Sequence, residues 1–338
     1  MTIRAALRDG IHRVNSAPMV LAGLLLVTLL LALPLGLALR DMLRTHLGDS
    51  LAADTLASGV NYDWWQEFSA QASGIGTTFT PTIIGFGAVL DNLSGLLDND
   101  RQSTVIVGAA TAYLVVWAFL IGGILDRFAR SRPTRSHGFF AASGVFFFRF
   151  LRLAIVMGLA YYILFGVVHG WLFGGLFKRL TRDLTVERTA FLWRAALYTV
   201  FGGLMAVCNM VFDYAKIRAV VEDRHSMIGA LAAAVRFVRR HPRSTFGLYL
   251  FDGVLFVMVI ALYALVAPGA GTTGAAMWTG FLIGQLYLAA RLWVKLVFYA
   301  SQTALFQGEL AHVGYTAGPQ PVWPESPAAE AIVNAARR

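Results

Sequence analysis

Six apolar segments in the chain each have about the length needed to cross a lipid bilayer. A transmembrane helix requires roughly 20 consecutive, predominantly apolar residues. The segments cover residues 17–39, 104–125, 153–177, 189–212, 245–266 and 275–297. Because lipid cannot hydrogen-bond a bare backbone, only helices and closed barrels cross membranes, and uninterrupted apolar runs of this length are typical of helices. We therefore predict an all-α membrane protein, a six-helix bundle with interfacial amphipathic helices.

The composition supports a membrane protein rather than a soluble one. Hydrophobic residues make up 57% of the 338-residue chain and charged residues 14%. Soluble domains have roughly half and about a quarter, respectively. We expect one membrane domain over residues 17–312, preceded by a cytoplasmic N-terminus over 1–16. The proline-rich tail, 313–338, is predicted to be disordered.

Charged residues are distributed unevenly between the ends of the predicted spans. The stretch 209–244 has seven basic and three acidic residues, whereas 40–101 has three basic and eight acidic residues. Since positively charged loops stay on the cytoplasmic side, residues 213–244 are predicted to form an inner basic loop and 40–103 an outer acidic segment. Both termini then lie in the cytoplasm, and the bilayer is a cell inner membrane. The loop 178–188 is net basic yet falls outside by this count; were it inside, the aromatic-rich run before it would form a separate span.

The sequence does not arrange its polar residues in a known catalytic or metal-binding pattern. Its one cysteine, Cys208, excludes an intramolecular disulfide and a cysteine cluster. The seven histidines have none of the spacings that zinc sites use, and we interpret the glycine pattern at 269–274 as a turn between two spans. We predict no catalytic residue, metal or cofactor. The net charge of +9 gathers at span ends, so it does not indicate nucleic acid.

Charged residues inside the predicted spans form a candidate ligand site. Asp252 lies in the fifth span, and Arg291 and Lys295 lie four residues apart on one face of the sixth, so antiparallel packing would let Asp252 pair with either. The same inner third of the bundle contains Arg149, Arg152 and Asp213. Such a layer would bind an anionic substrate or lipid headgroup. The alternative, which we favour, is snorkelling side chains and structural ion pairs near the interface.

A basic amphipathic helix is predicted in the inner loop. Ser226 would cap it, and Ile228, Leu231, Val235 and Val238 would form its apolar stripe. The cations that lie away from this stripe or follow it are Arg236, Arg239, Arg240 and Arg243. This patch is expected to face anionic lipids of the inner leaflet.

Further short elements flank the spans. The aromatic-rich run 139–150 is predicted to be an interfacial lead-in to the third span, and 83–97 is too short to span. In the outer segment, Trp64, Trp65 and Phe68 indicate a helix at the lipid headgroups.

Small residues in the third span indicate close helix packing. Gly166, Gly170 and Gly174 recur four apart, which lets a neighbouring backbone approach. We favour packing within the chain. The alternative is a seam for a membrane-protein partner, and the outer segment is a second candidate surface for such a partner.

The run Val211–Arg218, followed by Glu222–Arg224, resembles the end-of-span sequence of bacterial polytopic inner-membrane proteins. These are loosely similar to the six-helix membrane region fused to some glycerophosphodiester phosphodiesterases. The resemblance implies an inner-membrane bundle. In those fusions the activity belongs to a separate soluble barrel, and the present sequence has no matching alternation of strands and helices, so the resemblance implies no activity here.

Two functional hypotheses follow. The first is a non-catalytic membrane component, acting as an accessory, scaffold or envelope-maintenance protein. The second is a transporter or lipid-handling protein that uses the charged layer. An enzyme ranks third, because no reactive pair of residues can be named.

Overall fold

The computed structural model describes residues 1–48, 50–80, 85–131, 135–269 and 274–312. Helices are the regular elements in these ranges. The α-helices are α1 (Ile3–Asn15), α2 (Pro18–Leu47), α3 (Ala52–Ser58), α4 (Tyr62–Gln71), α5 (Phe86–Asp98), α6 (Thr104–Arg130), α7 (Ser136–Ile163), α8 (Phe177–Thr181), α9 (Glu187–Val221), α10 (Met227–Arg240), α11 (Pro242–Val266) and α12 (Ala275–His312). A 3₁₀ turn, η1 (Gly74–Thr78), and two π-helical stretches, η2 (Leu164–Val168) and η3 (Gly170–Leu176), complete the set. The predicted tail, 313–338, and most of the turn at 269–274 lie outside the described residues.

Six helical segments are long and apolar enough to cross a membrane, which confirms the predicted fold class. Five of them are single helices: α2, α6, α9, α11 and α12. The sixth is the continuous run Ser136–Thr181, through α7, η2, η3 and α8. The run 139–150 is therefore continuous with the third span, and its interfacial position stays a prediction. This run is helical without a break because it packs against α6, where a side chain at Gly122 would meet Cβ of Phe146 at 2.9 Å.

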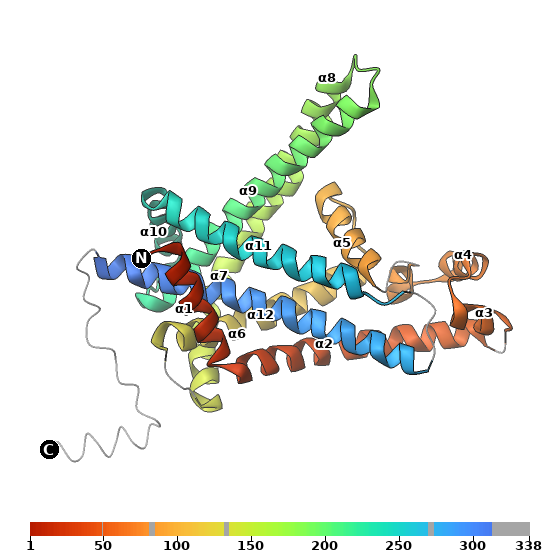
Figure 1. Ribbon diagram of the computed structural model, residues 1–338, viewed down its shortest axis with the longest axis horizontal. Helices are drawn as coiled ribbons and strands as arrows, with labels where there is room; N and C mark the ends of the chain where they lie inside the picture. Colours follow the sequence, from red (N-terminus) through yellow and green to blue (C-terminus); the bar gives the residue numbers. More distant parts are fainter. Residues whose placement is uncertain (49, 81–84, 132–134, 270–273, 313–338) are drawn as a thin grey trace.

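The helices diverge from one end of the molecule (Figure 1). We call this the basic end; it contains α1, α10, the C-terminal parts of α6, α9 and α12, and the start of α11. The opposite, acidic end contains α3 and α4, beyond the far end of α2. The hairpin of α7, α8 and α9 leaves the basic end at an angle to α2, α11 and α12 (Figure 1).

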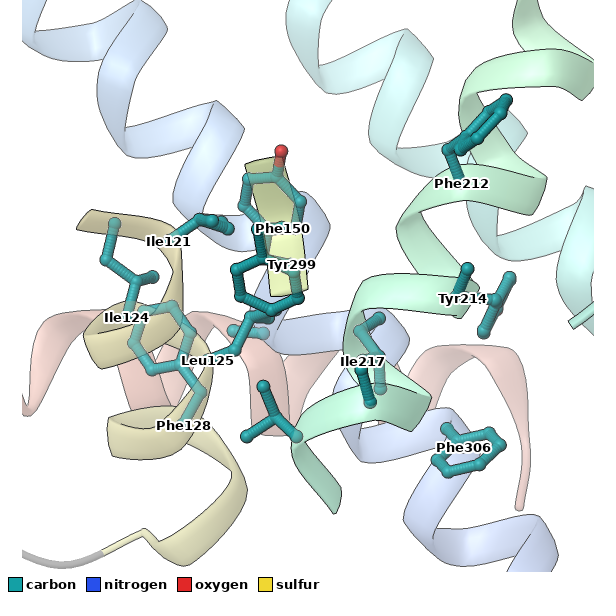
Figure 2. Close-up of a cluster of buried hydrophobic side chains, with 14 of the residues drawn as sticks. Ile121, Ile124, Leu125, Phe128, Phe150, Phe212, Tyr214, Ile217, Tyr299 and Phe306 are labelled. Carbon is teal, nitrogen blue, oxygen red and sulfur yellow. The ribbon is translucent and has the colours of Figure 1, made fainter. Parts of the chain in front are cut away.

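The main hydrophobic core lies at the basic end, around the segment Leu292–Phe306 of α12. Nearly every side chain of this segment is buried or half-buried, so it is enclosed on all sides by protein. Figure 2 shows the surrounding side chains, which come mainly from α6 and α9. Away from this core, apolar side chains on the long helices are exposed, for example Leu159 at 59% and Leu262 at 63%. Such surfaces are stable in contact with acyl chains.

Residues 1–16, which we predicted only to be an N-terminal extension, form a helix that packs onto the end of α12. Gly10 lies directly against Ser301, and Ala6 and Val14 are buried. The amino group of Met1 pairs with Glu309 at 3.0 Å. Arg13 donates to the Phe128 carbonyl of α6 at 2.7 Å. The first and last helices are therefore joined by both packing and charge.

The outer segment folds onto the end of α2. Trp64 and Phe68 of α4 are buried and contact the His46 ring of α2. The Trp65 indole donates to the Phe79 carbonyl at 3.0 Å. These aromatic rings therefore pack against protein; the predicted helix is α4, and its position at the lipid headgroups stays a prediction.

Helix α5 attaches the outer segment to the hairpin. Asn99 donates to the Phe165 carbonyl, and His169 contacts the Leu97 carbonyl at 2.9 Å. Asp98 accepts from the Tyr198 hydroxyl and pairs with Arg194 at 3.2 Å. The hydrogen bond from Tyr198 lowers the pKa of Asp98 below its ordinary value of 3.8, because it stabilises the carboxylate.

Replacing Gly10 with Ala should destabilise the protein by about 1–3 kcal/mol, because the new Cβ would lie 2.6 Å from the Ser301 backbone nitrogen and force α1 away. The measurement is thermal unfolding of the purified protein in detergent. Gly23→Ala is the control, since its Cβ would meet nothing within 4 Å. A Gly10→Ala variant as stable as the Gly23→Ala variant would contradict this packing.

Replacing Tyr198 with Phe should loosen α5 from the hairpin, because Asp98 loses its principal donor. Because folding lowers the pKa of Asp98, its carboxylate contributes stability that is complete above the ordinary pKa and is lost as the pH falls through the lowered pKa. In the wild type, hydrogen exchange of the α5 amides, corrected for intrinsic rates, should thus be constant from pH 5 to 8 and become faster below about pH 4. The control is Tyr162→Phe on α7, whose ring is 73% exposed. Equal α5 protection in the two variants would refute the attachment.

Candidate functional site

A buried ion pair lies at the centre of the basic end. Lys216 donates to Asp213, one turn earlier on α9, at 2.9 Å. Their side chains are only 15% and 13% exposed. The Lys216 ammonium also lies 5.6 Å from the centre of the Tyr299 ring on α12. The pair therefore joins α9 to the enclosed segment of α12 and satisfies two charges that would be costly alone.

Lys295 lies against aromatic rings of α6. Its ammonium is 3.5 Å from the centre of the Trp117 ring, a close cation–π contact. The Trp117 ring in turn lies 6.3 Å from the Tyr299 ring that Lys216 contacts, so Lys295 and the ion pair lie on neighbouring rings. Arg291, one turn away, is exposed and lies over the Tyr287 ring of its own helix. Of the two cations predicted on this face, only Lys295 thus reaches the protein interior.

Asp252 is fully buried, and its partner is not the predicted one. Its Oδ2 accepts a hydrogen bond from the Ser301 hydroxyl at 2.8 Å. Within the described residues it forms no ion pair with Arg291 or Lys295, so that prediction is wrong. The reason is register: α11 meets α12 further along than we placed it, beyond the predicted end of the sixth span. Asp252 Oδ1 and the Tyr214 hydroxyl are buried without a hydrogen-bond partner among these residues.

The remaining members of the predicted layer lie apart from this centre. Arg149 pairs with Asp223 at 2.6 Å and contacts His225, in the turn between α9 and α10. Arg152 is exposed and donates to the Phe148 carbonyl one turn earlier. The structure therefore brings together Asp213, Lys216 and Lys295 and keeps Arg149 and Arg152 elsewhere.

Helix α10 is capped as predicted but is rotated from its predicted orientation. Ser226 accepts from the Gly229 amide at 3.2 Å. The face that packs on the core is Met227, Ala230, Ala233, Ala234, Phe237 and Val238. Ile228 is 75% exposed and Val235 is 38% exposed, so half of the predicted stripe faces outward, whereas Leu231 is half-buried and Val238 is buried. Hydropathy favoured the larger side chains, whereas the close packing on α9 leaves room for alanines.

The basic patch of α10 differs from other arginines at the basic end. Arg130 and Arg218 each bind a carboxylate on their own helix, and Arg224 binds Glu222. The patch itself is exposed and has no hydrogen-bond or ion-pair partner in the described part of the chain; it consists of Arg236, Arg239, Arg240 and Arg243. These charges are available to groups outside the protein.

The predicted packing of Gly166, Gly170 and Gly174 within the chain is not observed. A Cβ on any of the three would meet nothing within 4 Å in the described structure. This face of the hairpin is therefore open. Across the described ranges, no group of three or more His, Cys, Asp or Glu side chains is placed to hold a metal ion.

No protein-family model, curated protein or solved structure matches the chain. The residues of the charged centre must therefore be interpreted from their own geometry.

Three members of the polar core were not predicted from the sequence: Lys216, Tyr299 and Ser301. Lys216 follows Asp213 by three residues on one helix, a spacing that predicts a pair. Ser301 gave no such signal, because it lies beyond the predicted sixth span, 275–297.

Replacing Lys216 with Met should destabilise the protein by roughly 3–5 kcal/mol, since Asp213 would remain charged and buried without its partner. The double variant Asp213→Asn/Lys216→Met should recover part of this loss, because no lone charge is left inside. Thermal unfolding in detergent measures both. Lys178→Met, at an exposed position on α8, is the control. If Lys216→Met and Lys178→Met unfold at the same temperature, the pair has no structural role.

Proposed function

We propose that the chain is a non-catalytic component of a bacterial inner membrane, acting as an accessory, scaffold or envelope-maintenance protein. In this proposal the basic end and both termini lie in the cytoplasm, and α3, α4 and α5 lie outside. The bundle then holds an ordered outer segment at a fixed place relative to the inner leaflet.

The observation that carries this proposal is the pairing of polar groups within the core. Asp213 pairs with Lys216, Lys295 lies on Trp117, and Asp252 accepts from Ser301. These contacts hold helices together, which supports a structural role for the charged centre. Two grooves of the described structure lie at the surface, one along Leu37–Arg44 and one between α9, α10 and α11.

Charge and surface chemistry support the assignment of the two ends. The unpaired arginines of α10 suit the anionic inner leaflet, where each is worth about 1 kcal/mol. The acidic segment 40–103 suits the opposite side. Its loops and helices expose Leu51 at 84% and Tyr62 at 61%, beside a buried aromatic cluster. Exposed apolar residues on an ordered outer element are typical of surfaces that contact other proteins.

Photo-crosslinking in cells tests the scaffold role. A photoreactive amino acid at position 62 should give a discrete protein adduct, because Tyr62 points outward from α4. The same amino acid at position 64 is the control, since Trp64 is 6% exposed and should give little or none. Adducts only to lipid from both positions would argue against a partner at the outer segment and hence against this function.

One observation favours the transporter hypothesis as a second candidate. Asp252 Oδ1 and the Tyr214 hydroxyl are both buried and unpartnered within the described residues, so a proton or a small cation would relieve their desolvation. Under this hypothesis, proteoliposomes containing the protein would dissipate an imposed proton or sodium gradient, and Asp252→Asn would abolish the effect. Equal leakage with and without Asp252 would eliminate this candidate.

A further inference from the structure

A surface groove lies where α10 joins α11 and crosses α9. Its volume is about 400 Å³, and its walls are Val207, Val211, Val235, Val238, Arg239, Pro242 and Phe246. Six of these seven residues are apolar, and the only charged one is Arg239. The volume falls within the usual range of small-molecule sites.

Polarity changes along the length of this groove. Arg239 and Pro242 lie at the α10–α11 junction, at the basic end. Val207 lies one turn further from that end than Val211 on α9, and Phe246 lies one turn further along α11 than Pro242. Because Val207 and Phe246 lie further from the basic end than Arg239, the groove begins at a cation and continues between apolar side chains. An amphiphile with an anionic head and an acyl chain has the same order of groups.

Arg239 is free to bind such a head. It is exposed and has no partner in the part of the chain that the structure describes, unlike Arg218 and Arg224, which share Glu222. The other arginines of the patch, Arg236, Arg240 and Arg243, are also exposed and unpaired within those ranges, and they add positive potential without lining the groove. A guanidinium binds a phosphate through two parallel hydrogen bonds.

We infer that this groove is a binding site for one anionic phospholipid, with its phosphate on Arg239 and an acyl chain along Val211, Val207 and Phe246. The site goes beyond the scaffold role and rests on it only in that the basic end faces a leaflet containing anionic lipid. The bound lipid covers the apolar groove and joins the α10–α11 corner to the membrane. This site is specific, in contrast to general adhesion by the whole basic patch.

The test is native mass spectrometry of the purified full chain, titrated in detergent with phosphatidylglycerol, phosphatidylcholine or inorganic phosphate. The wild type should retain one phosphatidylglycerol, with much weaker retention of phosphatidylcholine and none of phosphate. Arg239→Gln should weaken retention about fivefold or more, as expected for loss of one cation beside a lipid phosphate. Arg240→Gln, the matched control, removes the same charge one residue away and should retain the lipid.

A second variant tests the acyl-chain part of the groove. Val235→Phe should displace the lipid without disturbing the core, because Val235 lines the groove from a partly exposed position. Equal weakening by Arg239→Gln and Arg240→Gln, or equal retention of phosphatidylcholine, would overturn the site. Should Val235→Phe fail to fold, the arginine pair alone decides. Crosslinking at position 62 is independent of this result, so the site and the scaffold role can fail separately.

Discussion

The enclosure of the α12 segment Leu292–Phe306 is the constraint on which the rest of the structure depends. Its side chains are all buried or half-buried, including the polar Lys295, Ser301 and Thr303, which would be costly to place in lipid, so other helices must surround it. Helices α1, α6, α9 and α11 all pack on α12, and α10 reaches it through Phe237 on Phe306. Since their contacts are concentrated at one end, the long helices need not stay together at the other end. The diverging hairpin in Figure 1 follows from this distribution of contacts.

The polar groups of the core follow from the same constraint. Asp213 and Lys216 lie beside the enclosed segment, where water is scarce, and each reduces the cost of burying the other. Asp252 and Ser301 join α11 to α12 in the same way. Removing one partner leaves the other buried without a hydrogen bond, which costs more than having apolar side chains at both positions. These residues therefore fix the register of the helices as well as their proximity.

The sequence predicted the six spans and the Ser226 cap, because a long apolar run and a capping serine each have a local physical cause. It did not predict which apolar face contacts protein, since lipid and protein interiors are both apolar and hydropathy cannot separate them. For this reason Ile228 was assigned to the apolar stripe while Ala230 and Ala234 pack on the core. The pairing of Asp252 with Ser301 depends on where two helices cross. The register of two helices is set by how their surfaces fit, as where Gly10 of α1 lies against Ser301 of α12. No spacing within one helix predicts it.

The docking of α1 on the far end of α12 constrains the order in which the helices can pack during synthesis. Helix α1 is made before α12, which carries its binding surface and the Glu309 partner of Met1. Until the sixth span has been inserted, Ala6, Gly10 and Val14 have no partner, and α1 must wait at the membrane surface. Docking of α1 therefore has to follow insertion of the sixth span, and a chain truncated within α12 would leave this apolar face exposed for quality-control proteases.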